Sequence, residues 1–257
     1  MALRGRMGAI FRAHRQTVLL ITIIFMFAVR PLFGDTGPGA VVFSLALVFV
    51  VLAALLTLHV EDMVGEREAL IAQQRRWIVV GWALAIPAIV ERVLMLFFPG
   101  RGLVLAGALS WFVLLSFVTW SQIRILLKQR EVTSETISMS ISIYLLLGLC
   151  WTLLYIVIFT RHPESFSLQL APGVNEQHLF PIFVYFSLTC LSTIGFGDIT
   201  PLTLASRYAA VAEGITGQFY LAIIVARLVS LQISAHGAGR SSAAEAERLS
   251  GSTDQPR

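Results

Sequence analysis

The sequence has few charged residues and only two cysteines. Charged side chains make up 13% of the 257 residues, whereas a soluble domain usually carries about 25%. The chain therefore lacks the polar surface of a soluble protein, and a net charge of only +4 gives no extended basic surface for nucleic acid. Cys150 and Cys190 both lie within apolar runs, so neither a disulfide framework nor a cysteine metal site is expected.

Long apolar segments are what the sequence has in abundance. Hydrophobic residues account for 56% of the chain, and a helix needs about 20 mainly apolar residues to cross a bilayer. Segments of this kind lie at 16–33, 40–59, 77–98, 103–127, 137–159 and 204–233. We therefore predict an all-α membrane protein with six transmembrane helices in contact with membrane lipids.

The distribution of basic residues predicts the orientation of these helices. Arginine and lysine collect before the first segment, between the second and third, between the fourth and fifth, and after the sixth. The alternate loops hold only Arg30, Arg101 and Arg161. Basic loops favour the cytoplasm, so we expect both termini there and an even number of spans. Nearly all cationic residues are arginine, which is typical of a GC-rich bacterial genome and points to a bacterial inner membrane.

An apolar stretch between the last two spans is too short to cross a membrane. As a helix, 179–192 would cover about 20 Å, less than the hydrocarbon thickness of about 30 Å, and both its ends must reach the outer side. It must therefore enter as a short helix and return as extended chain at 193–198, Thr-Ile-Gly-Phe-Gly-Asp. Non-helical backbone at that depth is tolerated only where it is buried in protein or lines a wet cavity.

The composition of 193–198 suits cation binding. Gly195 and Gly197 permit positive φ, which lets successive carbonyls point to one side instead of alternating as in a strand. Carbonyls that face one axis can replace the water around a cation. Thr193 adds a hydroxyl oxygen, and Asp198 places a carboxylate at the outer mouth. The predicted ion sites are the carbonyls of Thr193, Ile194, Gly195 and Phe196.

The motif at 193–198 resembles the signature filter of the potassium-channel superfamily, threonine-x-glycine-aromatic-glycine-aspartate. The flanks are also similar, because "YFSLTCLS" resembles the pore helix of that superfamily and "ITP" its outer turn. The resemblance covers about 137–233. It implies a homotetramer, since one chain supplies one of four filter strands, with potassium ions in the filter and no other cofactor. The whole chain resembles bacterial six-span proteins identified as potassium or two-pore-domain-like channels, although it holds a single pore segment.

Two positions depart from the commoner pattern of the superfamily. Phe196 replaces a tyrosine and lacks the hydroxyl that can brace the filter from behind. Thr189 stands where some bacterial channels place a glutamate that pairs with the filter aspartate. Both departures bear on the stability of the filter more than on its selectivity.

The chain is expected to consist of four regions. The last, 234–257, is small and polar, so we predict a disordered cytoplasmic tail that is too short for a folded ligand-binding domain. The other three are a cytoplasmic tail at 1–16, a four-helix region at 17–130, and a pore module at 131–233 with an outer helix at 137–159, a pore helix at 180–192, the filter at 193–198 and an inner helix at 204–233.

Gating candidates lie in the last span. The fourth span has no arginine ladder, and steep voltage gating needs several charges in the membrane, so we do not expect it. Glu213 lies one turn before Gly217, where many such channels have a hinge glycine. A lone buried carboxylate is costly unless it is paired or protonated, so Glu213 is either a gating contact or a packing residue. By analogy with the family, the cavity-lining candidates are Gln218, Leu221, Val225 and Val229.

Three other functions remain open from the sequence. The first is a channel that also passes sodium, although filters of that kind usually break the second half of the motif, which is intact here. The second is a non-conducting scaffold, for which a complete filter would have no purpose. The third is an intramembrane aspartyl protease with a Gly-x-Gly-Asp motif, which needs two carboxylates that share a proton. The other aspartates lie in loops, at a span end or in the tail, at Asp35, Asp62 and Asp254.

Overall fold

The protein is described by a computed structural model that covers residues 14–33, 37–60, 68–97, 100–129, 131–168 and 179–251. Helices make up nearly all of this part of the chain. The long ones are α2 (Arg15–Phe33), α3 (Gly37–Val60), α4 (Glu68–Phe97), α5 (Arg101–Lys128), α6 (Ser134–Arg161) and α8 (Leu204–Gly251). The shorter elements are the 3-10 helix η1 (Pro163–Ser165), the strands β1 (Phe166–Leu168) and β2 (Ile199–Pro201), and helix α7 (Leu179–Leu191).

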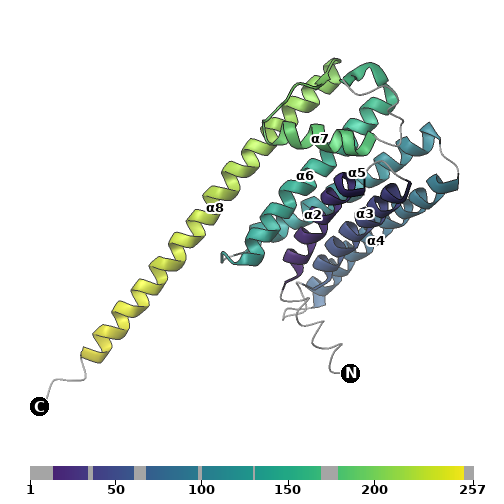
Figure 1. Cartoon of the computed structure of the whole chain (residues 1–257). Coiled ribbons are helices and arrows are strands. Elements are labelled where there is room, and N and C mark those ends of the chain that lie inside the picture. The colour runs from purple at the N-terminus through teal and green to yellow at the C-terminus, as the bar shows by residue number, and fades with distance from the viewer. Residues whose placement is uncertain are drawn as a thin grey trace, which may run out of the picture.

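Helix α6 joins the two halves of the molecule. On one side it packs against α2 and α5, and on the other it packs against α7 and α8. Figure 1 shows α8 along the edge opposite to α3 and α4, with α6 and α7 between them. The C-terminal part of α8 extends past the ends of the other helices. The four N-terminal helices therefore reach the last helix mainly through α6.

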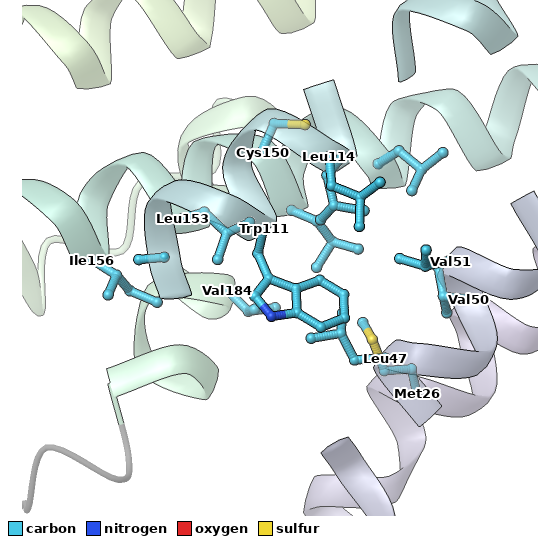
Figure 2. Packing of buried hydrophobic residues seen from close by; sticks show 14 of the residues in the cluster. Met26, Leu47, Val50, Val51, Trp111, Leu114, Cys150, Leu153, Ile156 and Val184 are labelled. Atoms are coloured by element: carbon cyan, nitrogen blue, oxygen red, sulfur yellow. The ribbon is translucent and has the colours of Figure 1, made fainter. Parts of the chain in front are cut away.

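One apolar core runs through both halves (Figure 2). Trp111 of α5 is 3% exposed and lies between Leu47 of α3 and Leu153 of α6. Val184 of α7 belongs to the same cluster. A large aromatic side chain contributes much apolar area to such a core. Because the cluster spans α2 to α7, the N-terminal helices and the short helix α7 are held in one packed unit.

The start of α2 is bound by a carboxylate of α6. Glu135, in the first turn of α6, accepts a 2.8 Å hydrogen bond from the backbone N–H of Gln16 at Oε2. Its Oε1 accepts a 2.5 Å bond from the hydroxyl of Thr17. The first N–H groups of a helix have no partner within it, and negative charge is favoured there. Glu135 therefore accepts hydrogen bonds from the N-terminus of α2 and fixes it beside the start of α6.

The end of α5 is bound by an arginine of α8. Arg227 Nη2 donates to the backbone carbonyls of Leu127, at 2.6 Å, and Gln129, at 2.9 Å. The last carbonyls of a helix are unpaired and carry partial negative charge. The guanidinium thus satisfies the C-terminus of α5 and links it directly to α8, a contact between residues about 100 positions apart in the chain.

Three helices in the described part of the chain are long and apolar enough to cross a membrane. They are Gly102–Lys128 in α5, Ser134–Arg161 in α6 and Leu204–Ile233 in α8. Shorter apolar stretches among the described residues are Arg15–Ala28, Leu45–Leu55, Val79–Glu91 and Leu179–Leu191. These segments show a helical membrane protein.

The structure differs from the sequence prediction at several helix ends. Helix α8 continues past the predicted end at 233 to Gly251, through residues predicted to be disordered. The run Ala-Ala-Glu-Ala-Glu-Arg-Leu at 243–249 has high helix propensity, which explains the difference. Helix α4 begins at Glu68 instead of 77. Most of the predicted N-terminal tail, 1–13, lies outside the described residues, as do the last six residues.

The Arg227 contact predicts a loss of stability when it is removed. Arg227→Ala should lower the free energy of unfolding by about 1–2 kcal/mol, because the C-terminal carbonyls of α5 lose a charged donor. The change should appear as a lower melting temperature of the purified protein in detergent. Arg161→Ala, at an exposed position in the last turn of α6, is the matched control. Equal melting temperatures for the two variants would show that the Arg227 contact contributes nothing.

Candidate functional site

The site begins with α7, a short helix held by aromatic packing. Phe183 and Phe186 of α7 are buried and lie against Tyr155 of α6 and Phe166 of β1. The ring centroids of Phe166 and Phe183 are 5.0 Å apart and those of Tyr155 and Phe186 are also 5.0 Å apart, both pairs edge to face. Such pairs stabilise beyond their buried area. The cluster fixes α7 between the C-terminal half of α6 and the strand β1 that follows it.

The backbone after α7 has an alternating conformation. The φ angle is positive at Thr193 (60°), Gly195 (53°) and Gly197 (82°), and these are the only such residues in the described part of the chain. Positive φ at the two glycines agrees with the sequence prediction. Alternation between left-handed and ordinary φ turns successive carbonyls to the same side, unlike the pleat of a strand. At Thr193 positive φ is a strained conformation for a residue with a side chain, and no sequence pattern predicted it.

The amides of this segment point toward α7. Thr193 N donates to Cys190 O at 3.0 Å, and the N–H groups of Ile194 and Gly195 donate to Thr189 O at 2.9 and 3.2 Å. The last carbonyls of α7 thereby receive donors, and the amides of 193–195 are satisfied. The carbonyls of 193–197 receive no backbone hydrogen bond within the described part of the chain. Their oxygens are therefore not occupied by backbone donors.

Tyr185 of α7 supports the C-terminal half of the segment 193–198. Its ring is stacked on that of Phe196, with centroids 6.1 Å apart and planes inclined by 4°. Its hydroxyl group also interacts electrostatically with Asp198, and Asp198 Oδ1 accepts a 3.0 Å bond from Ile199 N. The side chain of Phe196 has no hydroxyl group, but Tyr185 on α7 places one beside the same segment. The sequence reasoning missed Tyr185, although an aromatic residue in a pore-helix-like stretch was a visible signal.

The chain after Asp198 is fixed by strand pairing that the sequence did not reveal. Strand β2 pairs antiparallel with β1, and Leu168 lies opposite Ile199. Ser165 O accepts 2.8 Å hydrogen bonds from Leu202 N and from the hydroxyl of Ser206. The segment that follows α6, through Ser165 and β1, therefore holds the C-terminal end of 193–198 and the start of α8 in place.

Gly217 allows α8 to pass directly behind the end of α7. A Cβ atom at Gly217 would collide with the backbone carbonyl of Leu191, the last residue of α7. A Cβ atom at Gly214, one turn earlier, would lie 3.7 Å from Cys190 O, an ordinary contact. The structure thus gives Gly217 a packing role, with α8 helical on both sides of it. A hinge at Gly217 stays a prediction.

Glu213 lies at the junction of three helices. It is fully buried, and its Oε2 accepts a 2.5 Å hydrogen bond from the hydroxyl of Tyr155 on α6. Its Oε1 lies 2.5 Å from the hydroxyl oxygen of Ser187 on α7. The structure therefore brings Glu213 together with α6 and α7 behind 193–198, and does not place it at the surface of α8.

The remaining predicted residues are exposed in the single chain. The segment 193–198 is exposed throughout, with Phe196 68% accessible. The predicted cavity-lining residues are also exposed on α8: Gln218, Leu221, Val225 and Val229. Among the described residues there is no group of three or more His, Cys, Asp or Glu side chains that could hold a metal ion. The candidate cation ligands are therefore the oxygens of 193–198. Asp35, Asp62 and Asp254, which the protease alternative concerns, lie outside the described residues.

These features define a helical membrane protein in which a short helix leads into backbone with exposed carbonyls. The comparison with protein families agrees with this class. Residues 143–233 match the model of a family described as "Ion channel", and the matched segment contains most of α6, all of α7, the segment 193–198 and the first part of α8. The match supports the resemblance to the potassium-channel superfamily for this part of the chain. Helices α2 to α5 lie outside it, and no curated protein matches the chain at a significant level.

The close approach at Gly217 predicts a position-specific effect of a methyl group. Gly217→Ala should lower the free energy of unfolding by about 1–3 kcal/mol, because the new Cβ displaces α8 or the end of α7. Gly214→Ala, where the same methyl group meets only an ordinary contact, should be neutral or slightly stabilising because alanine favours a helix. Thermal unfolding in detergent measures both. A more stable Gly217→Ala protein would contradict the close contact with Leu191.

Proposed function

We propose that the protein is a homotetrameric potassium-selective channel of a bacterial inner membrane. The observation that carries the proposal is the backbone of 193–198, with positive φ at alternate residues and its first amides bound to α7. Four copies of such a segment around an axis would present rings of carbonyl oxygens to a cation, as in potassium-channel filters. The family match over 143–233 supports conduction of an ion.

The proposed ion sites lie between successive oxygen rings. The carbonyls of Thr193, Ile194, Gly195 and Phe196 would replace the hydration shell of potassium, with the hydroxyl of Thr193 at the inner end. Asp198 would raise the local concentration of cations at the outer mouth. In this mechanism transport is passive. The chain supplies only oxygen ligands that replace hydration water, and the ion moves down its own electrochemical gradient.

Exposure along α8 supports assembly with further copies. In the most apolar stretch of α8, only 11% of the residues are buried, whereas the corresponding shares are 56% in α6 and 39% in α5. Large apolar side chains remain exposed along several sides of this helix, among them Tyr208, Val211, Ile215, Phe219 and Ile223. Lipid can cover one side, but the carbonyls of 193–198 need facing oxygens for a cation to lose its water. A tetramer meets this need, and Gln218, Leu221, Val225 and Val229 would then line its inner cavity.

The topology proposed is six spans with both termini in the cytoplasm. Helices α2, α3 and α4 pack with α5 and α6 in one apolar core, and the 24 residues of α3 give about 36 Å of helix, enough to cross the hydrocarbon. The bond from Gln16 to Glu135 joins the start of α2 to the start of α6, and the bond from Arg227 to Gln129 joins α8 to the end of α5. Arg15 and Lys128 flank this end, which favours the cytoplasm.

Selectivity for potassium is favoured over a pore that also passes sodium. Both filter glycines adopt positive φ, and Tyr185 supports Phe196 and Asp198 from behind. A laterally supported filter resists collapse around a smaller ion. A non-selective pore would be expected to lack such support in its outer half.

The decisive experiment compares potassium and sodium flux through purified protein in liposomes. We expect potassium to pass and sodium to be excluded, and Gly195→Asp to abolish the flux, because Gly195 has φ of +53° and lies at a carbonyl site. Gly102→Ala, at an open position in the first turn of α5, is the control and should conduct normally. Equal flux of both ions would favour the non-selective alternative. No flux of either ion under any condition would contradict the proposed channel.

The support by Tyr185 gives a separate prediction. Tyr185→Phe keeps the ring stacked on Phe196 but removes the hydroxyl group that interacts with Asp198, so potassium flux should decline during sustained recording while the potassium-to-sodium ratio stays near the wild-type value. Tyr185→Leu removes both contacts and should lower the ratio as well. Single-channel or planar-bilayer recording measures both quantities. Identical behaviour of the wild type and both variants would show that the filter does not depend on Tyr185.

A further inference from the structure

The contacts around the Glu213 carboxyl group need more hydrogen atoms than the neighbouring hydroxyl groups supply. Three short oxygen–oxygen contacts lie there. Tyr155 Oη lies 2.5 Å from Glu213 Oε2, Ser187 Oγ lies 2.5 Å from Glu213 Oε1, and Ser187 Oγ lies 2.7 Å from the backbone carbonyl of Gly148. Each contact needs one hydrogen atom between its two oxygens, because two bare acceptors at such distances repel.

The two hydroxyl groups supply only two of the three hydrogens. Tyrosine and serine each carry a single hydroxyl hydrogen. If Ser187 donates to Glu213, its contact with Gly148 O has no hydrogen. If Ser187 donates to Gly148 O, its contact with Glu213 Oε1 has none, unless the carboxyl group itself provides it. Only a protonated Glu213, with its hydrogen on Oε1, gives every contact a donor.

The electrostatic surroundings favour the same state. The titratable groups near the Glu213 carboxyl are Tyr144 and Tyr155 on α6 and Cys190 on α7, none of which is a cation. No ion pair to Glu213 occurs in the described part of the chain. A buried carboxylate without a cation is very costly, and more so at membrane depth. A neutral acid avoids this cost.

We propose that Glu213 is a protonated carboxylic acid that positions α7 behind the ion sites, an inference that deepens the proposed channel function and rests on it. The hydrogens run from Glu213 to Ser187 and from Ser187 to Gly148 O, while Tyr155 donates to Glu213. This chain joins α8, α7 and α6. Ser187 lies two residues before Thr189, whose carbonyl accepts from Ile194 N and Gly195 N. Glu213 therefore acts through α7 on the carbonyl sites and is a positioning residue.

Removal of the proton has a defined consequence. Ionised Glu213 takes the hydrogen of Ser187, and the contact between Ser187 and Gly148 O becomes a contact of two acceptors. The separation of α7 from α6 must then increase, and Thr189 moves with it. Alkaline pH should therefore reduce potassium flux in the wild type.

The first test is spectroscopic and independent of conduction. Infrared difference spectra of the purified full chain, recorded between neutral and alkaline pH, should show the C=O stretch of a protonated carboxylic acid at neutral pH and its loss on alkalinisation. Glu213→Gln should lack this band. A neutral-pH spectrum of the wild type with the same carboxylic-acid band as Glu213→Gln would overturn the proposal.

The second test is the pH profile of potassium flux in liposomes. A glutamine at 213 can donate to Ser187 from its NH2 group and accept from Tyr155 at its carbonyl, so Glu213→Gln should restore the neutral-pH arrangement and lose the alkaline decline. Glu213→Ala supplies neither group and should lose flux at neutral pH. An alkaline decline in Glu213→Gln equal to that of the wild type would also overturn the proposal.

The two tests separate this inference from the proposed function. If no variant conducts but the infrared band depends on Glu213, the protonated carboxyl stands and the channel function fails. If the wild type conducts potassium without the band, the channel stands and the protonated carboxyl fails. Should Glu213→Ala fail to fold, the comparison of Glu213→Gln with the wild type still decides the outcome.

Discussion

The structure depends on the hydrogen bonds between the last turn of α7 and residues 193–195. In a membrane, a backbone that leaves the helical path needs partners within the protein. Here the carbonyls of Thr189 and Cys190 accept the amides of 193–195. The same bonds satisfy the last turn of α7 and turn the carbonyls of the segment away from the helix. The orientation of the candidate ion ligands therefore depends on the position at which α7 ends.

This constraint explains why so much of the molecule converges on α7. Aromatic rings of α6 and β1 pack on one side of it, and α8 crosses its end at a glycine that admits the carbonyl of Leu191. The pairing of β1 with β2 holds the far end of 193–198. A displacement of α7 would strain each of these contacts, so the position of the carbonyls is determined by long-range packing as well as by the local motif.

The sequence predicted the local features well because their causes are local. An apolar stretch too short for a span, followed by two glycines, is enough to predict a short helix and positive φ at Gly195 and Gly197. The contacts that position these parts are not local: Tyr185 with Phe196, Gly217 with Leu191, and Arg227 with Gln129 join residues whose spatial proximity no pattern encodes. The end of α8 was mispredicted because its small, polar composition was given more weight than the helix propensity of alanine, glutamate and arginine.

The contact of Arg227 also bears on what the N-terminal helices do. The guanidinium lies on α8, well beyond Gly217 in the chain, and binds carbonyls of Leu127 and Gln129 at the end of α5. Movement of this part of α8 must either carry the end of α5 along or break these charged hydrogen bonds, at a cost of about 1–2 kcal/mol. Helix α5 in turn shares the apolar core with α2 to α4. These contacts couple α8 beyond Gly217 to the N-terminal helices, so in the proposed pore an influence of those helices would be mechanical and would not require a ladder of arginines.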